Sequence, residues 1–214
     1  MTAVGTGDRF ATTAAVLAAA LFVAGCSSTE PTDGARSDVL ASATTPSVER
    51  LAELRDAADL APCPAADGGQ STRSDLLTVR LGCLDGGPDV DVPGLVGTPY
   101  VVNFWASNCG PCKDEGPHLQ AVSEEASGRF QVLGVNYLDP GGEAGALAGA
   151  REFGMRFPSL FDPDGLLGPT FRFQGLPATF FVDADGVVVG QHVGAFDSAD
   201  ELRDAVELEL GVRL

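Results

Sequence analysis

Strand-like and helix-like segments alternate along most of the chain. Runs rich in β-branched and aromatic residues are typical of buried strands, and they occupy residues 99–107, 130–137, 157–162, 179–183 and 187–194. The last two flank an Ala-Asp-Gly turn, which is typical of a hairpin. Helical spacing or helix-end signals mark residues 47–60, 113–126, 143–154, 165–173 and 198–210. This alternation predicts an α/β fold whose sheet is covered on both faces.

Several helix ends are marked by single residues. Ser47 and Ser198 are candidate N-caps, and Glu201 stands at the capping-box position after Ser198. Gly154 is a suitable helix end, whereas Pro117 is expected to kink the helix that contains it. The first predicted helix presents one apolar face, made of Val48, Leu51 and Leu54.

The start of the chain has the pattern of a secretory signal. Residues 10–25 carry no charge, but the stretch is shorter than the roughly 20 apolar residues that span a membrane. The sequence Val-Ala-Gly-Cys at 23–26 resembles a bacterial lipobox; a plain cleaved signal followed by an unrelated cysteine is the alternative. We expect a signal peptide at 1–25 and a lipidated Cys26 that anchors the chain to the extracytoplasmic face of the cell membrane. Residues 26–46, which are small and polar, are expected to form a flexible tether.

Charge excludes one class of partner. The formal net charge is −17, from 13 basic and 30 acidic residues. Nucleic-acid binding needs a basic surface, so we expect no such partner. We also expect no cofactor, no bound metal and a monomeric chain.

Four cysteines follow Cys26 and divide into two pairs. Cys63 and Cys83 flank a Gly/Ser-rich stretch and a predicted strand. Pairing them would close a loop of roughly 20 residues and stabilise the fold by about 3 kcal/mol, and disulfides persist outside the cytosol. A zinc site built from all four cysteines is the alternative. However, structural zinc usually has two close-spaced ligand pairs, and only Cys109 and Cys112 are close-spaced here.

The close-spaced pair lies at a predicted strand-to-helix junction, in the sequence Trp-Ala-Ser-Asn-Cys-Gly-Pro-Cys at 105–112. We place Cys109 at or just before the helix N-terminus, where free N–H groups and the helix dipole favour a thiolate and make it the nucleophile. Cys112 follows one turn later and can resolve a mixed disulfide. A disulfide that closes so short a ring constrains the unfolded chain very little, so redox chemistry is the better explanation of this pair.

Together with Gly-Leu-Pro-Ala-Thr and the strands that follow it at 175–194, this motif resembles the thioredoxin superfamily. More narrowly, it resembles the TlpA/ResA-like membrane-anchored thiol–disulfide oxidoreductases, over about residues 75–210. The resemblance implies a thioredoxin-like fold with a central mixed sheet, an N-terminal hairpin within 77–92, and an insertion at 138–163 relative to plain thioredoxin. The chain after the tether is then expected to have two parts. Residues 47–74 form an N-terminal helix and a Cys-containing loop, and residues 75–214 form the thioredoxin-like domain.

The resemblance also implies a substrate groove. Pro177 matches the family's cis-proline, which lies against the CxxC motif and shapes this groove. The backbone of Leu176 would then pair with the bound substrate strand. Trp105, Gly110 and Pro111 are placed at the same groove.

The CxxCxxExP pattern of the TlpA/ResA group assigns a further role to Glu115. This residue follows Cys112 by one turn, and burial there would raise its pKa and let it relay protons to and from Cys112. A solvated helix residue is the alternative. Asn103 occupies the place of a buried aspartate in thioredoxin, so the proton-handling role is expected to pass to Glu115. Asn108 replaces the tryptophan usual beside the nucleophile, and the bulky aromatic patch there is missing.

The predicted function is thiol–disulfide exchange with protein partners, recharged by a membrane thiol donor or acceptor. The Gly-Pro dipeptide matches thioredoxin, a reductant at about −270 mV, whereas the oxidant DsbA lies near about −120 mV. This favours a reductant and, by the resemblance, a role in cytochrome c biogenesis. A disulfide-forming oxidase or isomerase of exported proteins is an alternative. A copper metallochaperone that uses both cysteines and His192 is another alternative, but such proteins space their cysteines CxxxC. If no copper binds, we expect both histidines, His118 and His192, at the surface.

Overall fold

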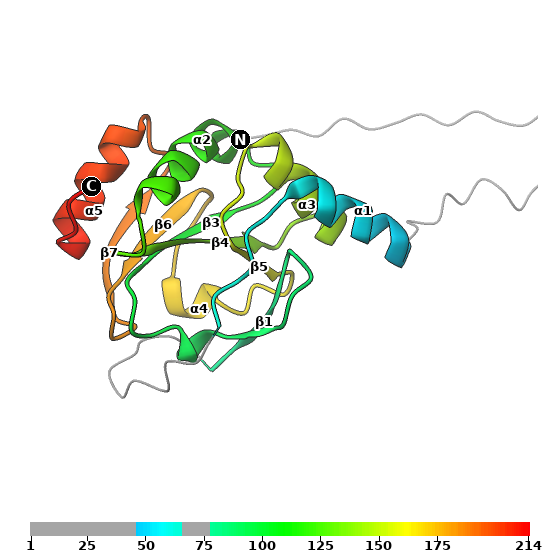
Figure 1. Cartoon of the computed structure of the whole chain (residues 1–214), viewed down its shortest axis with the longest axis horizontal. Helices are drawn as coiled ribbons and strands as arrows, with labels where there is room; N and C mark the ends of the chain where they lie inside the picture. Colours follow the sequence, from blue (N-terminus) through cyan, green and yellow to red (C-terminus); the bar gives the residue numbers. More distant parts are fainter. Residues whose placement is uncertain (1–45, 66–77) are drawn as a thin grey trace, which may run out of the picture. The chain divides into compact units, whose positions relative to one another are not determined.

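The structure of the chain is a computed structural model that describes residues 46–65 and 78–214 (Figure 1). The predicted signal peptide, Cys26 and nearly all of the predicted tether lie outside the described residues, as does the segment 66–77. Within the described part of the chain, none of the helices combines the length and the apolar character needed to cross a membrane.

The described residues form a mixed sheet with the strand order β2-β1-β5-β4-β3-β6-β7. Its central strands β3, β4 and β5 are parallel, and the other neighbours pair antiparallel. The strands are β1 (Arg80–Cys83), β2 (Val90–Asp91), β3 (Tyr100–Trp105), β4 (Gln131–Tyr137), β5 (Ser159–Asp162), β6 (Ala178–Val182) and β7 (Val188–Val193). The predicted mixed sheet is confirmed, and so are the hairpin β1–β2 within 77–92 and the hairpin β6–β7.

Helices cover the sheet on both faces (Figure 1). They are α1 (Val48–Ala58), α2 (Gly110–Glu125), α3 (Gly142–Glu152), α4 (Gly168–Phe171) and α5 (Ala199–Leu210), with a 3-10 turn η1 (Val92–Gly94). The predicted caps are present, because the Ser47 hydroxyl accepts from the Arg50 N–H and the Ser198 hydroxyl accepts from the Glu201 N–H, each at 3.2 Å. Both N-caps therefore begin their helices as predicted.

Two details of the helix predictions are wrong. The helix predicted over 165–173 is a single turn, because Arg172 adopts a left-handed conformation with φ 51° and ends α4. In α1, Leu51 and Leu54 pack against the core, but Val48 is 79% exposed. Val48 is the first helical residue, one turn before the part of α1 that reaches the core.

Strand β3 explains how the fold carries a site at its centre. Its residues are all buried, and alternate side chains enter two apolar cores. Val101 and Trp105 pack with residues of α2, α3 and α5, while Val102 and Phe104 pack on the opposite side of the sheet, with Phe171 of α4. Asn103 lies between Val101 and Trp105 in this alternation, so it faces α2 as a polar side chain inside an apolar layer.

Candidate redox site

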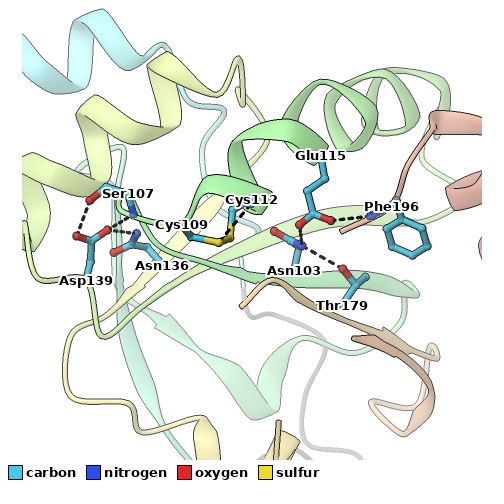
Figure 2. Close-up of a disulfide and its surroundings, with 9 residues drawn as sticks. All are labelled: Asn103, Ser107, Cys109, Cys112, Glu115, Asn136, Asp139, Thr179 and Phe196. Carbon is cyan, nitrogen blue, oxygen red and sulfur yellow. Dashed lines mark hydrogen bonds between the residues drawn. A yellow bond between two sulfur atoms is a disulfide. The ribbon is translucent and has the colours of Figure 1, made fainter. Parts of the chain in front are cut away.

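The two cysteines of the CxxC motif occupy the first turn of α2. Cys109 is the N-cap, and its Sγ accepts a hydrogen bond of 3.2 Å from the Cys112 N–H. The two sulfurs form a disulfide, with Cα atoms 5.3 Å apart (Figure 2). Cys109 is partly exposed, whereas Cys112 is only 1% exposed. Partner molecules can therefore reach the sulfur at the helix N-terminus, where a thiolate is favoured, but not the second sulfur.

Glu115 is a fully buried carboxyl group one turn after Cys112. Its Oε1 accepts from Asn103 Nδ2 at 2.8 Å, and its Oε2 accepts from the Phe196 N–H at 3.2 Å (Figure 2). Burial raises the pKa of Glu115 to about 7, although these two hydrogen bonds oppose the rise. A carboxyl group with this pKa exchanges its proton near neutral pH, as a general acid or base must.

Asn103 links Glu115 to the sheet. Its Nδ2 also donates to Thr179 Oγ1 at 3.0 Å, while its Oδ1 is buried without a partner among the described residues. A half-turn of the amide exchanges Nδ2 and Oδ1. The oxygen then faces Glu115 and Thr179, and it can accept from a protonated carboxyl and from the threonine hydroxyl. An asparagine at this position therefore suits both protonation states of Glu115, which a second carboxylate would not.

The segment before β6 contains a cis peptide bond between Leu176 and Pro177. Strand β6 begins at the next residue, Ala178, which pairs with Phe104 near the end of β3. Pro177 is thus brought beside the start of the redox motif. Leu176 is half-buried and packs, like Cys109, against the core beneath α2.

Trp105 does not line a groove, contrary to the expectation from the resemblance. Its side chain is 0% exposed and lies edge-on against Phe153, with ring centroids 5.9 Å apart. It belongs to the core because β3 is buried on both faces up to its last residue. Gly110 and Pro111 are exposed beside the disulfide.

A second buried carboxylate, which the sequence analysis missed, holds the loop that leads to Cys109. Asp139 accepts from the Ser107 N–H at 2.6 Å and from the Ser107 hydroxyl at 2.7 Å. It also accepts from Asn136 Nδ2 at 2.9 Å and from the Gly141 N–H at 2.8 Å. Burial would raise the pKa of Asp139, but these hydrogen bonds together hold it below its usual range. Figure 2 draws this cluster on one side of the disulfide and Glu115 on the other.

One signal in the sequence could have found Asp139. It follows β4 by two residues, at the carboxyl end of a parallel strand, and functional groups of α/β sheets gather at such ends.

Two glycines of α3 allow the loop that contains Ser107 to pack closely against this helix. A Cβ atom added at Gly149 would lie 2.9 Å from Ser107 Cβ, and one added at Gly145 would lie 3.3 Å from Ser107 Oγ.

A groove lies at Asn108, the residue before the partly exposed Cys109. It is a cavity of about 460 Å³ between the segments 106–108, 137–140 and 173–176. Asn108, which replaces the family's tryptophan, is exposed and forms part of its wall.

The other two cysteines form a second disulfide, which is the pairing that the sequence analysis favoured over zinc. Cys63 and Cys83 have Cα atoms 6.0 Å apart, and their bond ties the segment after α1 to β1. Together with Asp85 they are the only three metal-ligating side chains grouped within 4.8 Å in residues 46–65 and 78–214, but both sulfurs are bonded to each other. His192 stacks on Phe196, with ring centroids 4.0 Å apart, and in the described part of the chain it is not grouped with the redox cysteines.

The fold and the site define a thioredoxin-like protein. It has a CxxC disulfide at the start of a helix, and a cis-proline precedes the neighbouring strand β6. The chain belongs to the AhpC/TSA family, whose model matches residues 78–191. It is 36% identical over 116 residues to the thiol:disulfide interchange protein DsbE of Allochromatium vinosum, covering 52% of this chain and 62% of that protein. It is 34% identical over 99 residues to the DsbE of Escherichia coli K12, covering 46% of this chain and 51% of that protein.

Solved structures match over nearly their whole length. A structure of MTB dsbF in mixed oxidized and reduced forms has 30% identity and a TM-score of 0.57, over 64% of this chain and 98% of that chain. A thiol:disulfide interchange protein DsbE from Chlorobium tepidum, named as putative in its description, has 27% identity and a TM-score of 0.54, over 66% and 96%. The chain spans only 62% and 51% of the length of the two curated relatives above.

Proposed function

We propose that the protein is a thiol–disulfide oxidoreductase that acts on protein disulfides through Cys109 and Cys112. The observation that carries this proposal is the unequal exposure of the two sulfurs at a helix N-terminus, beside a buried carboxyl group with a pKa of about 7. The names of the DsbE relatives support the same activity.

The reaction proceeds through a mixed disulfide. The Cys109 thiolate of the reduced protein attacks one sulfur of the partner's disulfide, and the partner's other sulfur leaves and takes up a proton. Cys112 then gives its proton to Glu115 and attacks the Cys109 sulfur. This step forms the Cys109–Cys112 disulfide, and the partner's first sulfur leaves as a thiol. The partner gains two electrons from the protein. Of the two protons it gains, the first comes from the solvent, which received the Cys109 proton when the thiolate formed. The second is the Cys112 proton, which Glu115 passes on to the leaving sulfur.

Leu176 is proposed to line the groove for the partner segment and Pro177, which is buried, to shape it, while the exposed Gly110 and Pro111 lie beside the disulfide. The backbone of the half-buried Leu176 is proposed to pair with an extended strand of the partner. Leu176 packs against the same core as Cys109, which supports this placement.

Trapping experiments test the two cysteine roles. Cys112→Ser is expected to accumulate a mixed disulfide between Cys109 and a disulfide substrate, seen as a mass increase that a reductant removes. Cys109→Ser is expected to accumulate none and to lose reductase activity. Full activity of Cys109→Ser would show that the assignment is wrong.

The direction of electron flow follows from the midpoint potential. We propose a reductant, recharged by a membrane thiol donor and acting in cytochrome c biogenesis, on the Gly-Pro dipeptide between the cysteines. A potential near that of thioredoxin, about −270 mV, is expected in thiol buffers, whereas a value near about −120 mV would make the protein an oxidase of exported proteins. A copper-binding role is less well supported, because His192 stacks on Phe196 and is not grouped with the two sulfurs.

We further propose that the protein works outside the cytoplasm, after removal of residues 1–25 and lipidation of Cys26. The Cys63–Cys83 disulfide supports this location, because structural disulfides persist in oxidising compartments. Membrane fractionation is expected to recover the wild type with the membrane and Cys26→Ala in the soluble fraction. Recovery of both proteins in the same fraction would contradict the lipid anchor.

A further inference from the structure

The groove beside Cys109 has a composition that differs from that of the chain as a whole. Asn108 on one wall directly precedes Cys109, and Leu176 on another directly precedes Pro177. The cavity of about 460 Å³ falls within the usual range for binding pockets, about 300–1,000 Å³. A chain segment that presents a sulfur to Cys109 would therefore place its neighbouring residues in this groove.

None of the residues that line the groove is charged, in a chain with a net charge of −17. Its apolar surface comes from Tyr137, Leu138, Pro140, Phe173 and Leu176. Its polar side chains are the amides of Asn108 and Gln174, which can bond a peptide backbone. A charged side chain entering the groove would lose hydration without meeting an opposite charge, whereas an apolar side chain would gain from burial.

Leu138 is the most unusual part of this lining. It is 52% exposed and adopts a left-handed backbone conformation, with φ 48°. For a residue other than glycine this conformation costs about 1–2 kcal/mol, so the surroundings must impose it. They do so on both sides: the Leu138 N–H donates to the Asp162 carbonyl at 3.0 Å, and the next residue, Asp139, is the carboxylate that clamps Ser107. The same clamp that positions the redox loop therefore presents an apolar side chain to the solvent at the groove.

We propose that this groove selects disulfides whose cysteine is flanked by uncharged, apolar residues, and that Leu138 is the specificity-determining contact. The inference rests on the proposed function and adds the class of substrate. The occupant is an extended segment of the disulfide-bonded partner. Its apolar side chain next to the cysteine packs on Leu138, and its backbone meets the amides of Asn108 and Gln174.

The test uses the full chain and disulfide-bridged peptides that differ only in the residue beside the reactive cysteine: leucine, serine, glutamate or lysine. Glutathione disulfide serves as a small substrate that does not fill the groove. For the wild type we expect kcat/KM to be about tenfold higher with the leucine peptide than with the glutamate or lysine peptide, as for other apolar subsites. Serine should fall between them.

Two variants at position 138 separate specificity from folding. Leu138→Asn removes the apolar side chain, and Leu138→Asp adds a negative charge; both residues tolerate the left-handed region better than leucine does. Each should lose the preference for the leucine peptide by about tenfold, measured as the ratio of kcat/KM for the leucine peptide to that for the glutamate peptide, a ratio that a general loss of activity does not change. Leu166→Asp is the matched control, because Leu166 is another exposed leucine, at 46%, that does not line the groove.

The outcomes are distinct. Equal kcat/KM values for the leucine and glutamate peptides in the wild type would overturn this inference alone, and so would equal effects of Leu138→Asp and Leu166→Asp. A wild type that sediments as a dimer and becomes monomeric in Leu138→Asp would show that a second copy fills the groove, which also overturns it. A wild type that reduces neither glutathione disulfide nor any peptide would overturn the proposed function, and this inference with it.

Discussion

Replacing Glu115 by glutamine tests whether burial sets the proton affinity of the redox site. Glu115 is 0% exposed, and burial raises its pKa from the usual 4.5 to about 7. At about 1.36 kcal/mol per pKa unit, this rise corresponds to about 3 kcal/mol. Because the folded pKa exceeds the unfolded one, the contribution of Glu115 to stability is fully present below about pH 4.5 and is lost as the pH rises through about 7.

Glutamine has nearly the same shape and keeps an acceptor for one of the two donors, but it does not titrate. The free energy of unfolding of the oxidised wild type should therefore fall, relative to that of Glu115→Gln, by about 3 kcal/mol between about pH 4.5 and pH 8. Urea unfolding of both proteins across this range measures the difference. A uniform offset between the two curves carries no information, because only the change with pH reports the titration.

Glu125→Gln on the same helix is the control, because the pKa of Glu125 is shifted in the opposite direction. Hydrogen bonding to Arg203 lowers the pKa of Glu125, so its contribution to stability is present above the unfolded pKa and is lost as the pH falls. A constant difference between wild type and Glu115→Gln across the whole range would refute the assignment of a raised pKa to this group. A wild type that gains stability relative to Glu115→Gln as the pH rises would refute it equally.

Two further predictions concern the neighbours of the disulfide. Asp139→Asn should lower the free energy of unfolding by about 2 kcal/mol, the cost of losing hydrogen bonds to a charged group, and should shift the Cys109–Cys112 midpoint potential. Asp162→Asn, at a buried carboxylate that caps Leu166 and Leu167 instead, should cost similar stability and leave the potential unchanged; equal potentials in both variants would contradict a positioning role for Asp139. Asn103→Asp places two carboxyl groups at hydrogen-bond distance, so one of them should titrate well above 7, seen by infrared difference spectra as a carboxyl band that persists at higher pH than in the wild type. Loss of that band at the wild-type pH would contradict the contact.

Local signals in the sequence account for much of the fold and for part of the site. The strand ending at Trp105 and the helix that follows were predictable because burial on both faces of β3 leaves a run that is apolar except for Asn103. The position of Cys109 at the helix N-terminus follows from the same boundary. The buried state of Glu115 was expected only through a family pattern, since three residues of spacing place it on the face of Cys112 but do not say what covers that face.

The features that were missed depend on contacts between distant residues. Ser107 and Asp139 are 32 positions apart, and no local pattern around either residue predicts the hydrogen bonds between them. Trp105 was placed in the groove because it adjoins the motif in sequence, yet the strand keeps it inside the core. The helix predicted over 165–173 was too long, because apolar spacing continues past Arg172 although the backbone turns there. In each case tertiary packing overrides a local pattern.

The two buried carboxylates beside the disulfide differ in pKa for a reason that also divides their roles. Both lose hydration, but Asp139 receives four hydrogen bonds, including two from backbone N–H groups, while Glu115 receives two. The additional donors hold the pKa of Asp139 below its usual range, whereas that of Glu115 rises to about 7. Environments that push two titratable groups apart mark different functions. Near neutral pH, Asp139 stays ionised and fixes the loop before Cys109, so the pH dependence of the redox couple in this range belongs to Glu115 and the two thiols.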